Sequence, residues 1–168
     1  MKNTVIKYGG YGLLTGIVIF LATILLGKGL SYTTQEILGY ASMVASLSFI
    51  FFGIKHYRDK VNNGVVSLGK ATLIGILISI FVGVGVAIAD YIYTTTINPD
   101  FANEYLETTL KTMETSMIPE EFEIKKAELT KQMEDYGGSG TMALLMFITV
   151  VLIGCIISLI SGLILQRK

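Results

Sequence analysis

The chain alternates between long apolar stretches with few charges and shorter polar stretches, and this pattern predicts its elements. Four apolar stretches are each long enough for a helix to cross the hydrocarbon core of a bilayer. They predict membrane spans at about residues 8–27, 37–54, 68–93 and 142–165. The sequence therefore predicts an all-α fold: a four-helix transmembrane bundle that makes residues 1–168 a single integral membrane domain.

The first stretch has a second interpretation, because Lys2 and Lys7 precede an apolar run, as in a secretory signal. The run is long for a signal, glycines interrupt its start, and no small-x-small cleavage site follows Leu26. These features favour a retained span.

Small residues recur every fourth position in the third stretch, at Gly75, Ser79, Gly83 and Ala87. On a helix they share one face and form a shallow groove that lets a neighbouring helix approach closely. We therefore expect the other spans to pack against the 68–93 helix. The first and fourth spans carry small residues at the same spacing: Gly12, Gly16, Gly154, Ser158 and Gly162.

The segment 98–139 is polar but keeps apolar residues at helical spacing, which predicts two amphipathic helices. The first is expected to begin at Asn98-Pro99, and the second to run from Pro119 to Gly137-Gly138. Residues 99–136 hold ten acids against four lysines, a net charge of −6. Such a run is usually a solvated face, and a calcium site lacks the EF-hand spacing of ligands here.

Composition adds little beyond this, but the distribution of charge predicts an orientation. The net charge is zero, yet eight of the nine basic residues outside the acidic segment fall on the side that holds both termini and the 55–64 loop. Lys28 is the exception. Because Lys and Arg near span ends stay in the cytoplasm, both termini are predicted to be cytoplasmic and segment 98–139 extracytoplasmic. The basic cluster of the 55–64 loop either only sets this topology or also contacts anionic lipid headgroups.

Two side chains are candidates for chemistry. His56 is the single histidine; it is either an ordinary interfacial residue or a proton switch or ligand. Asp90 is the one acid near the end of an apolar run. It either marks the outer interface or faces the bundle interior, where an ionised carboxylate needs a partner. Lys28 is the basic residue expected on the same side, and Arg58 is a further candidate in the basic loop.

Several motifs resemble an uncharacterised bacterial membrane family, the domain-of-unknown-function family 4199. They are Gly53–Lys60 (GIKHYRDK), Asn63-Gly64, Gly69–Ala71, Gly75 and Pro99, within a four-span layout. The resemblance implies a four-helix protein of the bacterial inner membrane and supplies no activity, cofactor or functional residue. Members of the family usually carry another aromatic or aliphatic residue where His56 stands, so we do not expect His56 to be a required catalyst.

The sequence leaves two functions in competition. The first is an accessory or assembly protein that presents its acidic helical segment to a membrane-protein partner or a second copy. The alternative is a small oligomeric transporter or channel. An enzyme is not expected, because the sequence has no nucleophile–base pair, metal-ligand cluster or phosphate loop. We predict no cofactor, no metal and no nucleic-acid partner. The one certain partner expected from the sequence is the lipid bilayer.

Overall fold

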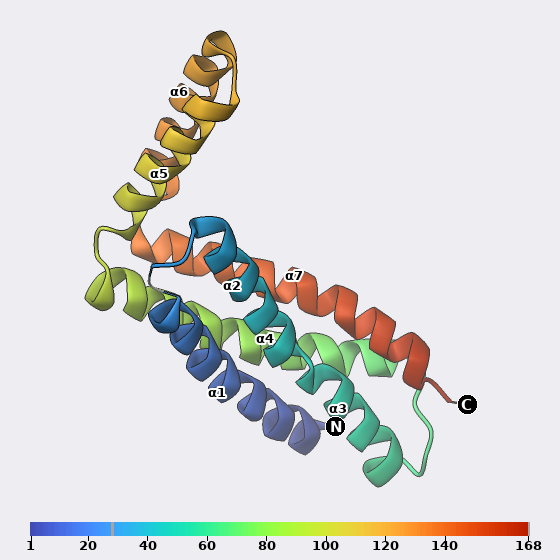
Figure 1. Ribbon diagram of the computed structural model, residues 1–168. Coiled ribbons are helices and arrows are strands. Elements are labelled where there is room, and N and C mark those ends of the chain that lie inside the picture. The colour runs from blue at the N-terminus through green and yellow to red at the C-terminus, as the bar shows by residue number, and fades with distance from the viewer. Residues whose placement is uncertain (28, 168) are drawn as a thin grey trace. The chain divides into compact units, whose positions relative to one another are not determined.

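The computed structural model describes residues 1–27 and 29–167, with Tyr32 described by its backbone alone, and this part of the chain is mostly helical (Figure 1). In chain order the elements are α1 (Lys2–Leu26), α2 (Tyr32–Leu47), α3 (Phe49–His56), η1 (Tyr57–Val61), α4 (Leu68–Ile92), η2 (Tyr93–Ile97), α5 (Phe101–Ser116), α6 (Pro119–Tyr136) and α7 (Ser139–Leu165). The elements η1 and η2 are single π-helical turns.

The chain divides into two compact units. The first comprises Met1–Ala89 and Leu145–Lys168, and therefore holds α1, α2, α3, η1 and most of α4 and α7. The second comprises Asp90–Leu144, which holds η2, α5 and α6 with the adjoining ends of α4 and α7.

Four helical runs are long and apolar enough to cross a membrane: Lys2–Leu26, Thr33–Val61, Leu68–Ile97 and Ser139–Leu165. Each of them contains most or all of one predicted span, so the four-helix transmembrane bundle is confirmed. The chain is an integral membrane protein.

Helix α4 is the most enclosed of the four. In the most apolar stretch of 18 residues of each run, half of the residues are buried for α4, against 22% for α1 and for α7. The buried side chains of α4 recur every fourth residue at Ile74, Ile78, Val82 and Val86. This spacing places them on one helix face, where they form a core with buried residues of α1, α2 and α3. The shallow groove of small residues lies on a neighbouring face, so α4 packs on more than one side.

The ends of several helices differ from the sequence prediction. Helix α2 begins at Tyr32, before the predicted start of the second span at residue 37, and the run continues through η1 to Val61, well into the predicted 55–64 loop. Within the run, α2 ends at Leu47, where the Ser48 hydroxyl donates to the Ala45 carbonyl at 2.7 Å. Apolar periodicity does not reveal such breaks, because a π-turn or a short interruption changes the backbone hydrogen bonds and leaves the order of apolar residues unchanged.

The polar segment forms two helices, as predicted, and the predicted start of the second at Pro119 is confirmed. The prediction for the first was wrong. Asn98 ends the π-turn η2 by donating its backbone N–H to the Tyr93 carbonyl at 2.8 Å, and α5 starts only at Phe101, after the N-cap residue Asp100. The π-turn thus uses the residue that the sequence assigned to a helix cap.

Candidate functional sites

The groove of small residues in α4 holds α7 at close range. A Cβ atom added to Gly75 would overlap the side chain of Ser158, and one added to Gly154 would overlap Ser79. One turn further along, a Cβ at Gly83 would lie 2.9 Å from the ring of Phe147. Real Cβ atoms do not come that close, so the two helices can adopt this separation only with small residues here.

The serines of this contact bond within their own helices. The Ser79 hydroxyl donates to the Ile76 carbonyl at 2.8 Å, and the Ser158 hydroxyl donates to the Gly154 carbonyl at 2.6 Å. Both side chains are therefore satisfied without a ligand, and their small size is what the contact uses. Of the remaining groove positions, Ala87 is half-buried, and Gly162 packs beside Leu68.

Glycines also line the contact between α1 and α4. A Cβ at Gly12 would lie 2.6 Å from Val82, and one at Gly16 would lie 3.4 Å from Val86. The closest approach involves Gly85, where a Cβ would lie 2.5 Å from the backbone carbonyl oxygen of Leu13. Sequence reasoning missed Gly85, because it lies off the four-residue series that runs through Gly75 and Gly83.

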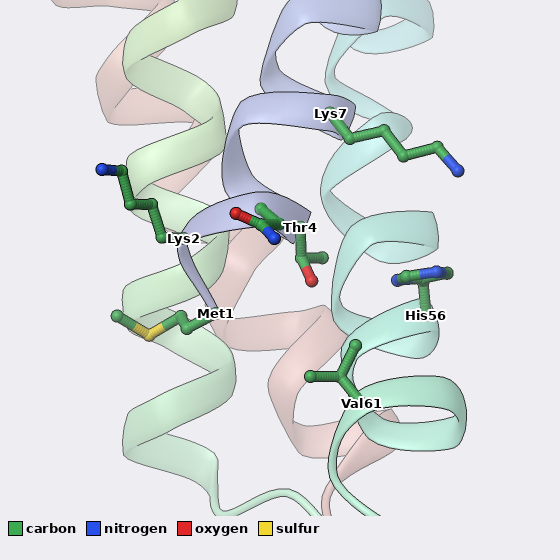
Figure 2. Close-up of a pocket in the computed structure, with 7 residues that line it drawn as sticks. Met1, Lys2, Thr4, Lys7, His56 and Val61 are labelled. Atoms are coloured by element: carbon green, nitrogen blue, oxygen red, sulfur yellow. The ribbon is translucent and has the colours of Figure 1, made fainter.

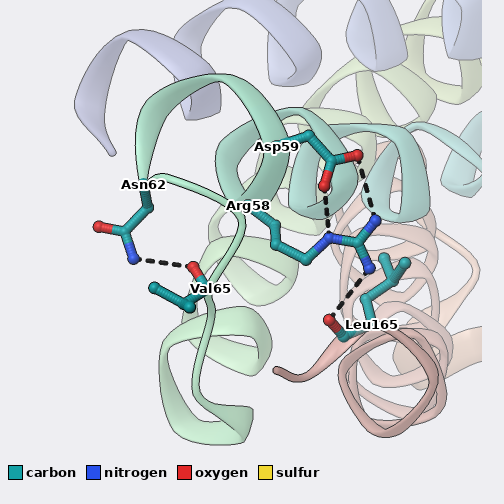
Figure 3. Close-up of polar contacts among 5 residues, drawn as sticks. All are labelled: Arg58, Asp59, Asn62, Val65 and Leu165. Carbon is teal, nitrogen blue, oxygen red and sulfur yellow. Dashed lines mark hydrogen bonds and ion pairs between the residues drawn. The ribbon is translucent and has the colours of Figure 1, made fainter. Parts of the chain in front are cut away.

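Arg58 is buried, with 8% of its surface exposed, at the end of the bundle where α7 finishes (Figure 3). Its Nε and Nη2 donate to the two carboxylate oxygens of Asp59 at 2.6 and 3.1 Å, and its Nη1 donates to the Leu165 carbonyl at 3.3 Å. The last carbonyls of a helix lack intrahelical partners and carry partial negative charge. The guanidinium therefore serves as a cap that joins η1 to the end of α7.

The loop after η1 is fixed in the same region. The Asn62 amide donates to the Val65 carbonyl at 2.8 Å, and the Gly64 N–H donates to the Arg58 carbonyl at 2.7 Å. Asn63 and Gly64 have φ angles of +52° and +85°, which Asn and Gly tolerate best. Two backbone hydrogen bonds between Val66 and Arg167, of 3.0 and 2.9 Å, then hold the end of the chain against this loop.

His56 lines an open pocket of about 340 Å³ between the start of α1 and the end of the α3–η1 run (Figure 2). Its ring packs at a tilt on Tyr8, with the ring centres 5.3 Å apart. The ring nitrogen Nδ1 is buried and has no hydrogen-bond partner within the described residues. The described residues that line it are Met1, Lys2, Asn3, Thr4, Lys7, His56 and Val61.

Asp90 belongs to the second unit and is buried, with 5% of its surface exposed. Its carboxylate oxygen Oδ2 has no hydrogen-bond partner in the part of the chain that the structure describes. Its backbone carbonyl accepts a hydrogen bond of 2.9 Å from the Thr94 hydroxyl. The suggested partner Lys28 lies outside the described residues, so the structure does not address that pair.

Helices α5 and α6 of the second unit each contain an ion pair on their surface. Each has one exposed ion pair of its own: Lys111 with Glu107 at 2.7 Å in α5, and Lys125 with Glu128 at 2.8 Å in α6. The hydrogen bond and charge of Lys111 lower the pKa of Glu107, and those of Lys125 lower the pKa of Glu128. In residues 1–27 and 29–167 no three His, Cys, Asp or Glu side chains gather in a way that could hold a metal ion.

The geometry thus gives helix seams, a charged cap at one end of the bundle, and an open pocket lined by the start of α1. No curated protein and no solved structure matches the chain. A family described as "Protein of unknown function (DUF4199)" matches residues 7–167, which is almost the whole sequence. The chain therefore belongs to the DUF4199 family.

Proposed function

We propose that this chain is a non-enzymatic accessory or assembly protein of the bacterial cytoplasmic membrane. Its transmembrane bundle would hold the α5–α6 pair outside the membrane, where the pair meets a partner protein. The observation that carries this proposal is that neither α5 nor α6 contains a single buried residue.

The α5–α6 pair lacks a closed core of its own. The two helices contact each other and run side by side as a hairpin (Figure 1). The apolar residues at their contact are only half-buried: Leu106, Leu110, Met113, Phe122, Leu129 and Met133. Helices of this length gain most of their stability from tertiary burial, so a pair with so little burial is stabilised further by anything that covers it.

The chemistry of the pair indicates what kind of partner it fits. Residues 99–136 carry a net charge of −6, and Ile118 and Ile124 are 61% and 69% exposed. Ile124 lies two residues from Phe122, which places it on nearly the opposite side of α6, away from the contact with α5. A protein surface that combines basic side chains with an apolar patch would complement both features.

Affinity purification of the full-length protein from native membranes tests this proposal. We expect a membrane protein to co-purify reproducibly, and Ile124→Ser to lower its yield without changing the melting temperature. Ala127→Ser is the matched control, because Ala127 is also exposed and lies one turn further along α6. A protein that purifies alone from native membranes, or a yield that is insensitive to Ile124→Ser, would argue against the proposal.

One observation favours the alternative function, a small oligomeric transporter or channel. A carboxylate buried near the end of a membrane span is costly unless it has a partner, and such groups often belong to ion or proton pathways. Asp90 fits that description, because it is buried and its Oδ2 has no partner within the described residues. Cation or proton flux through liposomes that contain the purified protein, lost in Asp90→Asn and kept in Asp90→Glu, would favour this alternative.

A further inference from the structure

We propose that the pocket between α1 and α3 binds a phosphate group, supplied either by the headgroup of an anionic phospholipid or by a soluble phosphate. This site is independent of the proposed role of α5 and α6, because it lies entirely within the first unit.

The charge of the pocket selects an anion. Among the described residues, its lining contains two lysines and one histidine and no acidic residue. Figure 2 shows the Lys7 side chain extending along the His56 side of the pocket, whereas Lys2 extends on the other side of α1. Neither lysine has a carboxylate within ion-pair distance in the described part of the chain, so their charge is not neutralised by a neighbour. The Lys7 ammonium lies over the ring of Tyr8, with Nζ 5.8 Å from the ring centre.

Thr4 supplies the observation that points to a specific ligand. It is 2% exposed, yet its hydroxyl makes no hydrogen bond within the described residues. Figure 2 shows the hydroxyl pointing into the space bounded by Met1, His56 and Val61. The hydroxyl oxygen is not itself sealed off by protein, so it is the part of Thr4 that a molecule in the pocket can reach. A phosphate oxygen in the pocket would accept this hydrogen bond.

His56 and the first turn of α1 provide further donors. Of the two ring nitrogens of His56, Nδ1 is the buried one, so Nε2 is the nitrogen that can reach a ligand. The N–H groups of Lys2, Asn3 and Thr4 lie in the first turn of α1, where a helix has no carbonyl to accept them. No side chain in the described part of the sequence caps this end of the helix. Free N–H groups at a helix start, together with nearby cations, form a typical phosphate site.

The pocket lies where a lipid headgroup could reach it. It is formed by the first turns of one span and the last turns of another, at the end of the bundle. A phosphate of an anionic lipid at that leaflet would be drawn to Lys7 and then held by Thr4 and His56. A free phosphate carries the same chemistry, so the experiment has to separate the two sources.

Native mass spectrometry of the full-length protein from vesicles of phosphatidylglycerol and phosphatidylcholine tests the site, with added inorganic phosphate as a second probe. We expect the protein to retain phosphatidylglycerol selectively. Thr4→Val and Lys7→Gln should each lower this retention about tenfold, because each loses a hydrogen bond to a charged group. Lys60→Gln, an exposed lysine outside the pocket lining, is the control and should not lower it.

Thr4→Val also separates binding from folding. If the hydroxyl served only the fold, its loss would leave lipid retention unchanged; if it binds phosphate, retention falls while the melting temperature without ligand stays the same or rises. Inorganic phosphate that binds with the same dependence on Thr4 and Lys7, and displaces the lipid, would assign the site to a soluble phosphate. Retention of phosphatidylglycerol that is equal in wild type, Thr4→Val, Lys7→Gln and Lys60→Gln, with no phosphate binding, would overturn the proposal.

Discussion

Single side chains at the end of the first unit decide how its helices are joined. Arg58 reaches a carbonyl 107 positions further along the chain, so one residue connects the second helical run to the fourth. We expect Arg58→Gln to destabilise the protein by about 1–3 kcal/mol, because it breaks the bond to the Leu165 carbonyl and the paired bonds to Asp59. Denaturant unfolding in detergent measures this.

Lys60→Gln provides the comparison for that substitution. Lys60 lies in the same π-turn and is exposed, so its loss should cost less than about 0.5 kcal/mol. Equal destabilisation by the two variants would mean that Arg58 does not cap α7.

The ion pair of α5 predicts a titration. The hydrogen bond from Lys111 lowers the pKa of Glu107, so the pair contributes stability above the unfolded-state pKa of Glu107, and this contribution is lost as the pH falls through the folded-state value. We expect Lys111→Gln to raise the pKa of Glu107 toward its ordinary value, as NMR of the side-chain carboxyl would show. The control Lys131→Gln in α6 should leave the pKa of Glu107 unchanged. A Glu107 pKa that is the same in wild type and in Lys111→Gln would contradict the pairing.

The helices of the bundle depend on glycine in a position-specific way. A Cβ at Gly85 would lie 2.5 Å from the backbone oxygen of Leu13, and no side-chain rotation can relieve a clash with backbone. We therefore expect Gly85→Ala to lower the free energy of unfolding by about 1–3 kcal/mol, in line with other overpacked positions. Thermal unfolding in detergent is the measurement.

Gly10→Ala is the matched control, because a Cβ at Gly10 of α1 would meet nothing within 4 Å. Alanine is the better helix former, so this change should be neutral or stabilise by up to about 1 kcal/mol. Destabilisation of the same size at both glycines would show that the separation of α1 and α4 does not depend on Gly85.

The elements also show what the sequence could and could not predict. Apolar length identified the four spans, because the thickness of a bilayer fixes how many apolar residues a helix needs. It could not place the break at Ser48 or the π-turns, since these depend on local hydrogen bonds that leave the apolar pattern unchanged. Likewise, nothing in the sequence around Arg58 indicates its bond to Leu165, which exists only once the helices have packed.

The candidate sites could likewise be predicted only in part from the sequence. The small-residue series in α4 could be read from spacing, and the structure places Gly75 and Gly83 against α7. Gly85 was missed because it lies off this four-residue series, although it approaches the backbone of α1. The pocket beside His56 could not be foreseen either, because its lining comes from the start of α1 and from the distant α3–η1 run.

For the whole molecule, the account requires one orientation in the membrane. The eight-to-one distribution of basic residues supports cytoplasmic termini, and an even number of spans then returns the chain to the same side. The α5–α6 pair, which joins the third span to the fourth, must in that case lie outside.

Labelling of single cysteines in intact cells tests this orientation most directly. In a Cys155→Ser background, which removes the chain's one native cysteine, Ala127→Cys would report on α6 and Lys60→Cys on η1; both positions are exposed. With a membrane-impermeant maleimide, the account predicts rapid labelling at 127 in intact cells and labelling at 60 only after the membrane is disrupted. Labelling at 60 but not at 127 in intact cells would contradict it, because the acidic pair would then lie in the cytoplasm, away from the partner we propose.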